Sequence, residues 1–69
     1  MTSKDLMIEL RLVRIRKGIS QHKLSQMIGV SRATIMNWES GAFTPSIEDF
    51  LSLCRALGVK ISIKEKSNG

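Results

Sequence analysis

The segment from residue 31 to residue 41, SRATIMNWESG, combines a guanidinium, an amide and several apolar side chains. If it is helical with Ile35 and Trp38 turned inward, a step of about 100° per residue turns four other residues outward. These are Arg32, Ala33, Met36 and Asn37. An arginine can make two hydrogen bonds to guanine, an asparagine two to adenine, and the apolar side chains can touch a thymine methyl group. No large acidic side chain stands on this face, so we predict that it enters the major groove of DNA.

The other reactive side chains form no catalytic or metal-binding pattern. One histidine, His22, and one cysteine, Cys54, are too few ligands for a zinc site. Cys54 is expected in the core, and His22 is expected to face solvent or a phosphate group. The serines fall at expected helix starts, with no histidine–acid pair beside any of them. We therefore expect no enzymatic activity, no metal and no cofactor.

The charge distribution favours a polyanionic partner. The net charge is +5, and no acidic residue occurs between Glu9 and Glu39. The cations in that interval are Arg11, Arg14, Arg16, Lys17, Lys23 and Arg32. A stretch of one sign attracts nucleic acid or, less often, an acidic membrane surface. The plainer alternative is a solvated cationic face without a partner.

The length of 69 residues indicates one domain, 1–69, with a core at about 4–58 and a C-terminal tail at 59–69. No apolar run approaches the roughly 20 residues that span a bilayer. A single cysteine and no signal-peptide pattern fit a reducing cytoplasm. So small a core gains stability from dimerisation.

Serines and glycines divide the core into four predicted helices. The first covers about residues 4–17 and begins at Thr2 or Ser3. The others are expected at about 20–29, 31–41 and 46–58, each with a serine at its start and a glycine at its end. Besides Ile35 and Trp38, the residues predicted to be buried are Leu6, Leu10, Val13, Leu24, Met27, Ile28, Ile47, Phe50, Leu51, Cys54 and Leu57. The fold class is all-α, a compact bundle of four to five helices.

The tail has a different pattern. Residues 59–64, VKISIK, alternate apolar and polar side chains, with Val59, Ile61 and Ile63 on one face, which is typical of a strand. A lone strand leaves its backbone hydrogen bonds unpaired. The tail is therefore expected either to lie on the bundle or to pair with the tail of a second copy.

The first helix carries a second apolar stripe, Ile8, Leu12 and Ile15, on the face opposite its core residues. Two stripes indicate a helix that is covered on both sides. We predict that this stripe and the tail, through Ile61 and Ile63, form a twofold homodimer contact. The alternative is that Ile61 and Ile63 fold back over the stripe within one monomer.

The link between the second and third helices is Ile28-Gly29-Val30-Ser31. A glycine followed by an apolar residue in a tight turn is typical of a helix-turn-helix. The run KGISQHKLSQMIGVSRATIMNWESG closely resembles the phage-repressor type of this motif, the Cro-repressor or XRE family. The resemblance covers about residues 10–59. Its matching positions are Arg14, Lys17-Gly18, Ser20-Gln21, Leu24, Gly29-Val30-Ser31, Ile35, Trp38-Glu39, Gly41, Pro45-Ser46 and Leu57-Gly58-Val59.

The resemblance implies roles for several polar residues. Glu39 is expected to pair with Arg14 and to lock the first helix to the third. Gln21 is expected to touch a phosphate and to steady the third helix, and the free N–H groups of a helix start also favour an anion. The phosphate-contact candidates are Gln21, Lys23, Ser31, Thr34, Ser40, Thr44 and Ser46. The loop at 40–44 lacks the lysines and arginines that the family often has there, so Arg16, Lys17 and Lys23 are candidates to compensate.

Together these features predict a sequence-specific regulator of transcription that binds double-stranded DNA. A repressor that binds an inverted-repeat operator as a homodimer is the expected form. An antitoxin with a cognate toxin partner, a phage or plasmid repressor, and a restriction–modification controller stay open as subtypes. The alternative from another class is a protein-binding adaptor that uses the same fold without reading DNA.

Overall fold

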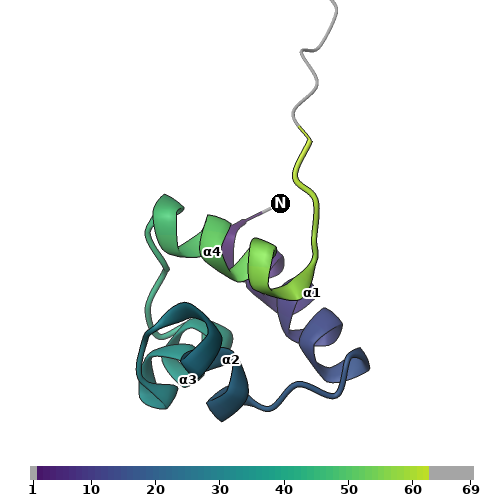
Figure 1. The fold of residues 1–69 in the computed structure, drawn as a ribbon. Coiled ribbons are helices and arrows are strands. Elements are labelled where there is room, and N and C mark those ends of the chain that lie inside the picture. Colours follow the sequence, from purple (N-terminus) through teal and green to yellow (C-terminus); the bar gives the residue numbers. More distant parts are fainter. Residues whose placement is uncertain (1, 63–69) are drawn as a thin grey trace, which may run out of the picture.

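The structure is a computed structural model, and it describes residues 2–62. That part of the chain forms four helices and no strand (Figure 1). The helices are α1 (Ser3–Arg16), α2 (Gln21–Ile28), α3 (Arg32–Ser40) and α4 (Ile47–Leu57). The predicted all-α class is confirmed. None of the described helices is long and apolar enough to cross a membrane.

Capping side chains start each helix where the sequence predicts. The hydroxyl oxygens of Ser20, Ser31 and Ser46 each accept a hydrogen bond, 2.9 to 3.1 Å long, from the backbone N–H three residues later. For α1 the cap is Thr2, which exchanges hydrogen bonds with Asp5. These bonds from Thr2 lower the pKa of Asp5 below its ordinary value. Glycines in the left-handed conformation end α2, α3 and α4.

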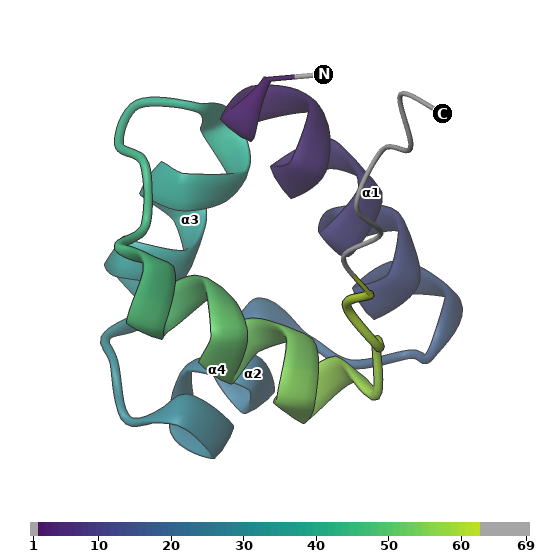
Figure 2. The ribbon, with the colours of Figure 1, turned by 90° about the horizontal axis from the view of Figure 1, so that it is seen from above.

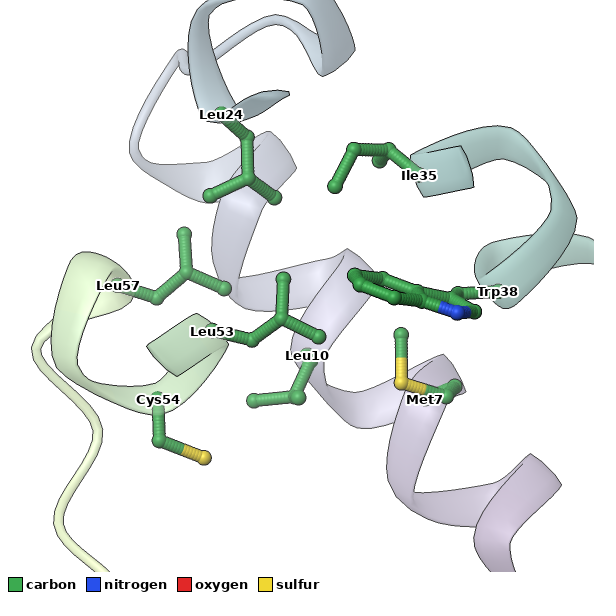
Figure 3. Close-up of a cluster of buried hydrophobic side chains, with 8 residues drawn as sticks. All are labelled: Met7, Leu10, Leu24, Ile35, Trp38, Leu53, Cys54 and Leu57. Atoms are coloured by element: carbon green, nitrogen blue, oxygen red, sulfur yellow. The ribbon is translucent and has the colours of Figure 1, made fainter. Parts of the chain in front are cut away.

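One apolar core receives side chains from all four helices (Figure 3). Its buried members are Met7, Leu10, Leu24, Ile35, Trp38, Leu53, Cys54 and Leu57. Burial raises the pKa of the Cys54 thiol, because the thiolate would lose its hydration. The predicted core position of this cysteine is confirmed.

Four residues predicted to be buried are exposed instead. Ile47 is 76%, Met27 45%, Leu51 42% and Leu6 38% exposed. On α4 the inward side belongs to Leu53, which the sequence analysis missed, and Leu51 lies about 160° from it around the helix.

On α1 and α2, too, a residue other than the predicted one faces the core. On α2 the inward place of Met27 is taken by Ser25, whose hydroxyl donates to the His22 carbonyl oxygen at 2.6 Å. On α1 it is Met7, not Leu6, that is buried. Each short helix turns only part of its circumference to the bundle, and an apolar residue at the border of that part stays exposed.

The arrangement sets α2 and α3 against each other, with α4 packed on α2 and α1 packed on both α3 and α4. From above, α1 and α4 run along two sides of the molecule (Figure 2). The described tail residues, 59–62, leave the end of α4 without regular secondary structure. Ile63 and Lys64 lie outside the described residues, so the predicted pairing of the tail stays a prediction.

Candidate nucleic-acid interface

The turn between α2 and α3 fixes how α3 leaves the bundle. Gly29 has φ +76°, a left-handed conformation that costs other residues strain. The N–H groups of Gly29 and Val30 both donate to the Ser25 carbonyl oxygen, at 2.9 and 3.0 Å. The Val30 side chain is half-buried against the core. The turn therefore holds α3 with one face packed and the other free.

The exposed face of α3 carries the predicted base-reading residues. Arg32, Ala33 and Met36 are exposed and Asn37 is half-buried, while Ile35 and Trp38 on the other face are buried. Within residues 2–62 the side-chain amide of Asn37 makes no hydrogen bond, so both its donor and its acceptor are available to a base edge.

A buried ion pair joins α1 to the end of α3. Arg14 donates from Nε to Oε2 of Glu39 at 2.7 Å and from Nη2 to Oε1 at 3.0 Å. Its Nη1 donates to the carbonyl oxygen of Ile19 at 2.8 Å. Only 10% of the Arg14 side chain and 5% of the Glu39 side chain are exposed. Paired hydrogen bonds between a guanidinium and a carboxylate fix both position and orientation.

Gln21 is held in the same cluster. Its Nε2 donates to Oε1 of Glu39 at 3.0 Å, so α1, α2 and α3 meet at one carboxylate. This bond is consistent with the role in steadying the third helix that the resemblance implies for Gln21. It leaves the amide oxygen, the second amide N–H and the backbone N–H at the start of α2 to meet a phosphate.

Two shallow hollows flank this cluster on the side of α3. One, of about 440 Å³, is lined by Ser20, Gln21, His22, Arg32 and Arg14. The other, of about 370 Å³, is lined by Arg11, Gln21, Met36, Glu39 and Ser40. Each combines a cationic side chain with a residue of the α2 start, an arrangement suited to an anion.

Arg11 is a cation that the sequence analysis missed as a site residue. Its Nε lies 3.8 Å from Oε1 of Glu39, and 54% of its side chain is exposed. The available signal was its position three residues before Arg14, which puts both on neighbouring parts of one helix face.

Some of the other phosphate-contact candidates already make hydrogen bonds within the chain, and others are simply exposed. The hydroxyls of Ser31 and Thr34 lie 2.8 Å apart in the α3 cap, and the Ser40 hydroxyl donates to the Asn37 carbonyl oxygen at 3.2 Å. The side chains of Lys23, Arg16 and Thr44 are exposed, and Ser46 caps α4.

Lys17 has a different location. Its ammonium group lies beside Gly58 at the C-terminal end of α4, where the helix dipole favours a cation. This position removes it from the face of α3. Among the described residues, no three potential metal ligands form a cluster.

The apolar residues predicted for a dimer contact fall into two places. Ile8, Leu12 and Ile15 are 45%, 47% and 50% exposed along α1. Ile61 instead lines a hollow of about 410 Å³ between α1 and α4, together with Leu6, Leu10, Phe50 and Cys54. The structure thus separates Ile61 from the stripe, because Leu6 and Leu10 occupy the other side of α1.

Known proteins share both the sequence and the fold. A helix-turn-helix family model matches residues 10–64. The HTH-type transcriptional regulator YgzD of Bacillus subtilis is 39% identical over 49 residues, which cover 71% of this chain and 74% of that protein. The antitoxin HipB of Escherichia coli is 29% identical over 59 residues, 86% of this chain but 63% of the antitoxin.

Solved structures extend the comparison. The P22 c2 repressor, in complex with a synthetic operator, superposes with a TM-score of 0.73 at 33% identity, covering 78% of this chain and 82% of the repressor chain. A chain from a HipA–HipB–operator complex superposes with a TM-score of 0.84 over 97% of this chain and 94% of its own length, at 24% identity, and shows the likeness of the fold. With the braced and exposed α3, these matches show that the chain belongs to the phage-repressor type of the helix-turn-helix family.

Proposed function

We propose that this protein is a sequence-specific regulator of transcription that inserts α3 into the major groove of double-stranded DNA. The observation that carries the proposal is the pairing of a free polar face on α3 with a buried brace behind it. The Arg14–Glu39–Gln21 cluster fixes α3, and so its outward side chains keep one geometry when they meet base edges.

The base-reading roles follow from side-chain chemistry. Arg32 is assigned to guanine, Asn37 to adenine, and Ala33 and Met36 to a thymine methyl group. Arg32 also lines the hollow at the start of α2, so its guanidinium reaches either the groove or the adjoining phosphate. Asn37 therefore provides the cleaner test of base reading.

The backbone of the DNA is met by cations and helix starts around α3. We assign phosphate contacts to Gln21, Lys23 and Arg11, and to the hydroxyls of Ser31, Thr34, Ser40, Thr44 and Ser46. Such contacts supply affinity that falls with salt and is independent of sequence.

The homodimer and the inverted-repeat operator belong to the same proposal. A twofold protein presents two copies of α3 to successive major grooves, with half-sites about 34 Å apart. The twofold contact is proposed on the tail side, where Ile61, Leu6 and Phe50 surround the apolar hollow between α1 and α4. Repression follows when the bound protein occupies a promoter in the cytoplasm.

Two subtypes have specific support. The similarity to HipB, an antitoxin, favours an antitoxin with a cognate toxin partner. The P22 c2 repressor favours a stand-alone repressor. A toxin gene adjacent to the gene for this protein would favour the antitoxin.

The experiment that tests the proposal is selection of bound duplexes from a random DNA pool at moderate salt. The proposal predicts recovery of a palindrome with two half-sites. Weak, salt-sensitive binding without an enriched sequence would instead favour the alternative, a protein-binding adaptor. That alternative leaves the base-matching residues on α3 without a purpose.

A further inference from the structure

The outer face of α1 is an apolar surface that nothing in the described chain covers. Ile8, Leu12 and Ile15 follow one another at helical spacing and are each about half exposed. All three lie away from the buried residues Met7, Leu10 and Arg14 of the same helix. A row of three large apolar residues on a small domain is typical of a contact surface.

Charged residues along one edge of this stripe are divided by sign. Asp5 and Glu9 precede the middle of α1, and Arg16 follows it. In an ideal helix these three residues fall within about 40° of one another around the axis. All three are exposed, and within residues 2–62 neither Glu9 nor Arg16 forms an ion pair.

This division makes the face complementary to itself. We infer that it docks on the same face of a second copy of this chain, with the two α1 helices antiparallel. If Ile8 of one copy lies opposite Ile15 of the other, Leu12 lies close to the twofold axis. Each Arg16 then lies within about 3 Å, along the axis, of both Asp5 and Glu9 of the second copy. A twofold contact of this kind is isologous, so every favourable pair occurs twice.

The remaining charges at this face, Lys4 and Arg11, are directed elsewhere. The Lys4 side chain lies beside Gly41 at the end of α3. Arg11 lies on the same edge of the stripe as Lys4, where two copies would bring like charges together near the axis. Its Nε is directed toward Glu39 of its own chain at 3.8 Å, which reduces that repulsion.

The contact differs from the one proposed for the tail. Ile61 lines the hollow with Leu6 and Leu10, on the other side of α1, and Glu9 lies at the border between that hollow and the stripe. The apolar residues of the two contacts are separate, so both contacts can be occupied together and link neighbouring dimers. Three half-exposed side chains form a small interface, which belongs to the weak and transient class.

Cross-linking of a cysteine near the predicted axis tests the inference without DNA. Full-length Leu12→Cys protein is oxidised mildly, and the rate of disulfide-linked dimer formation is measured. Arg55→Cys, an exposed position on α4, is the matched control, and the unmodified protein controls for buried Cys54. The inference predicts that Leu12→Cys cross-links faster than both controls.

Charge reversal then tests self-complementarity. Added to Leu12→Cys, Glu9→Arg should slow cross-linking by about three- to thirtyfold, since the two Glu9–Arg16 pairs are lost. Arg16→Glu should slow it further, because residue 16 then faces both Asp5 and Glu9 with the same charge. Adding Glu9→Arg to Arg16→Glu should raise the rate again, since one opposite-charge pair per site is regained. Cross-linking no faster than the controls, or a double reversal no faster than Arg16→Glu alone, would overturn the inference. Neither result bears on DNA binding, so the proposed function stands or falls separately.

Discussion

At the scale of residues, the polar cluster of Arg14, Glu39 and Gln21 decides whether α3 is held firmly. Two charges are almost fully removed from water there, and each is satisfied by the other and by neutral partners. No buried side-chain nitrogen or oxygen within residues 2–62 lacks a hydrogen-bond partner. Such a cluster specifies geometry, but loss of one member leaves a buried charge without compensation.

The variant Glu39→Gln tests this directly. It leaves the Arg14 charge buried, and we expect the free energy of unfolding to fall by about 3–5 kcal/mol. A domain of this size has roughly 3–10 kcal/mol in total, so the variant should be partly unfolded at room temperature. Urea denaturation followed by Trp38 fluorescence measures the change.

Arg11→Met is the matched control. This arginine touches the same carboxylate from the exposed side, so its loss should cost less than about 1 kcal/mol. Equal losses in the two variants would show that the buried pair has no special role.

At the scale of elements, the sequence predicts the helices better than their orientation. Every helix start and end falls within a residue or two of its expected place, because the capping serines and the glycines act locally. Which face turns inward is decided by neighbouring helices. On α4 the apolar residues occupy more than one face, so their spacing alone does not show which face is buried. The structure buries Leu53 and leaves Ile47 and Leu51 exposed.

In the candidate site, too, some features could be predicted from the sequence and others depend on packing. Ile35 and Trp38 are the two buried apolar residues of α3, and their burial leaves Met36 and the polar residues on one outward face. The bond from Gln21 to Glu39 and the approach of Arg11 depend on how α1, α2 and α3 cross. Only the packed structure sets those distances.

Substitution at Gly29 tests the turn between α2 and α3. The space around a new Cβ is open, so the cost of Gly29→Ala is confined to the left-handed backbone. We expect a loss of about 1–2 kcal/mol. Gly29→Asn should lose less, because asparagine tolerates this conformation better. Thermal unfolding of the two variants measures the order, and a loss for asparagine as large as for alanine would contradict the account.

At the scale of the whole molecule, charge and apolar surface are divided among three faces. Cations and helix starts gather around α3, apolar residues surround the hollow on the tail side of α1, and a third face is the outer stripe of the same helix. A DNA-binding face, together with the two faces proposed to contact copies of the chain, would suit a protein that assembles along DNA.

Replacing single cations shows which part of the surface contacts the DNA backbone. Lys23→Ala should weaken binding to all duplexes alike and reduce the slope of log affinity against log salt by about 1. Arg55→Ala, which removes an exposed cation on α4, should leave that slope unchanged. Fluorescence anisotropy across a salt series gives both slopes, and an unchanged slope for Lys23→Ala would show that this lysine does not meet the phosphates.

The most direct test of base reading by α3 compares the duplexes selected by the native protein and by Asn37→Ala. The account predicts that the variant loses its preference at one position in each half-site, at a cost of about 1–3 kcal/mol on the native sequence, while the other positions are kept. Identical selected sequences for the two proteins would contradict it, because the outward face of α3 would then not be read against the bases.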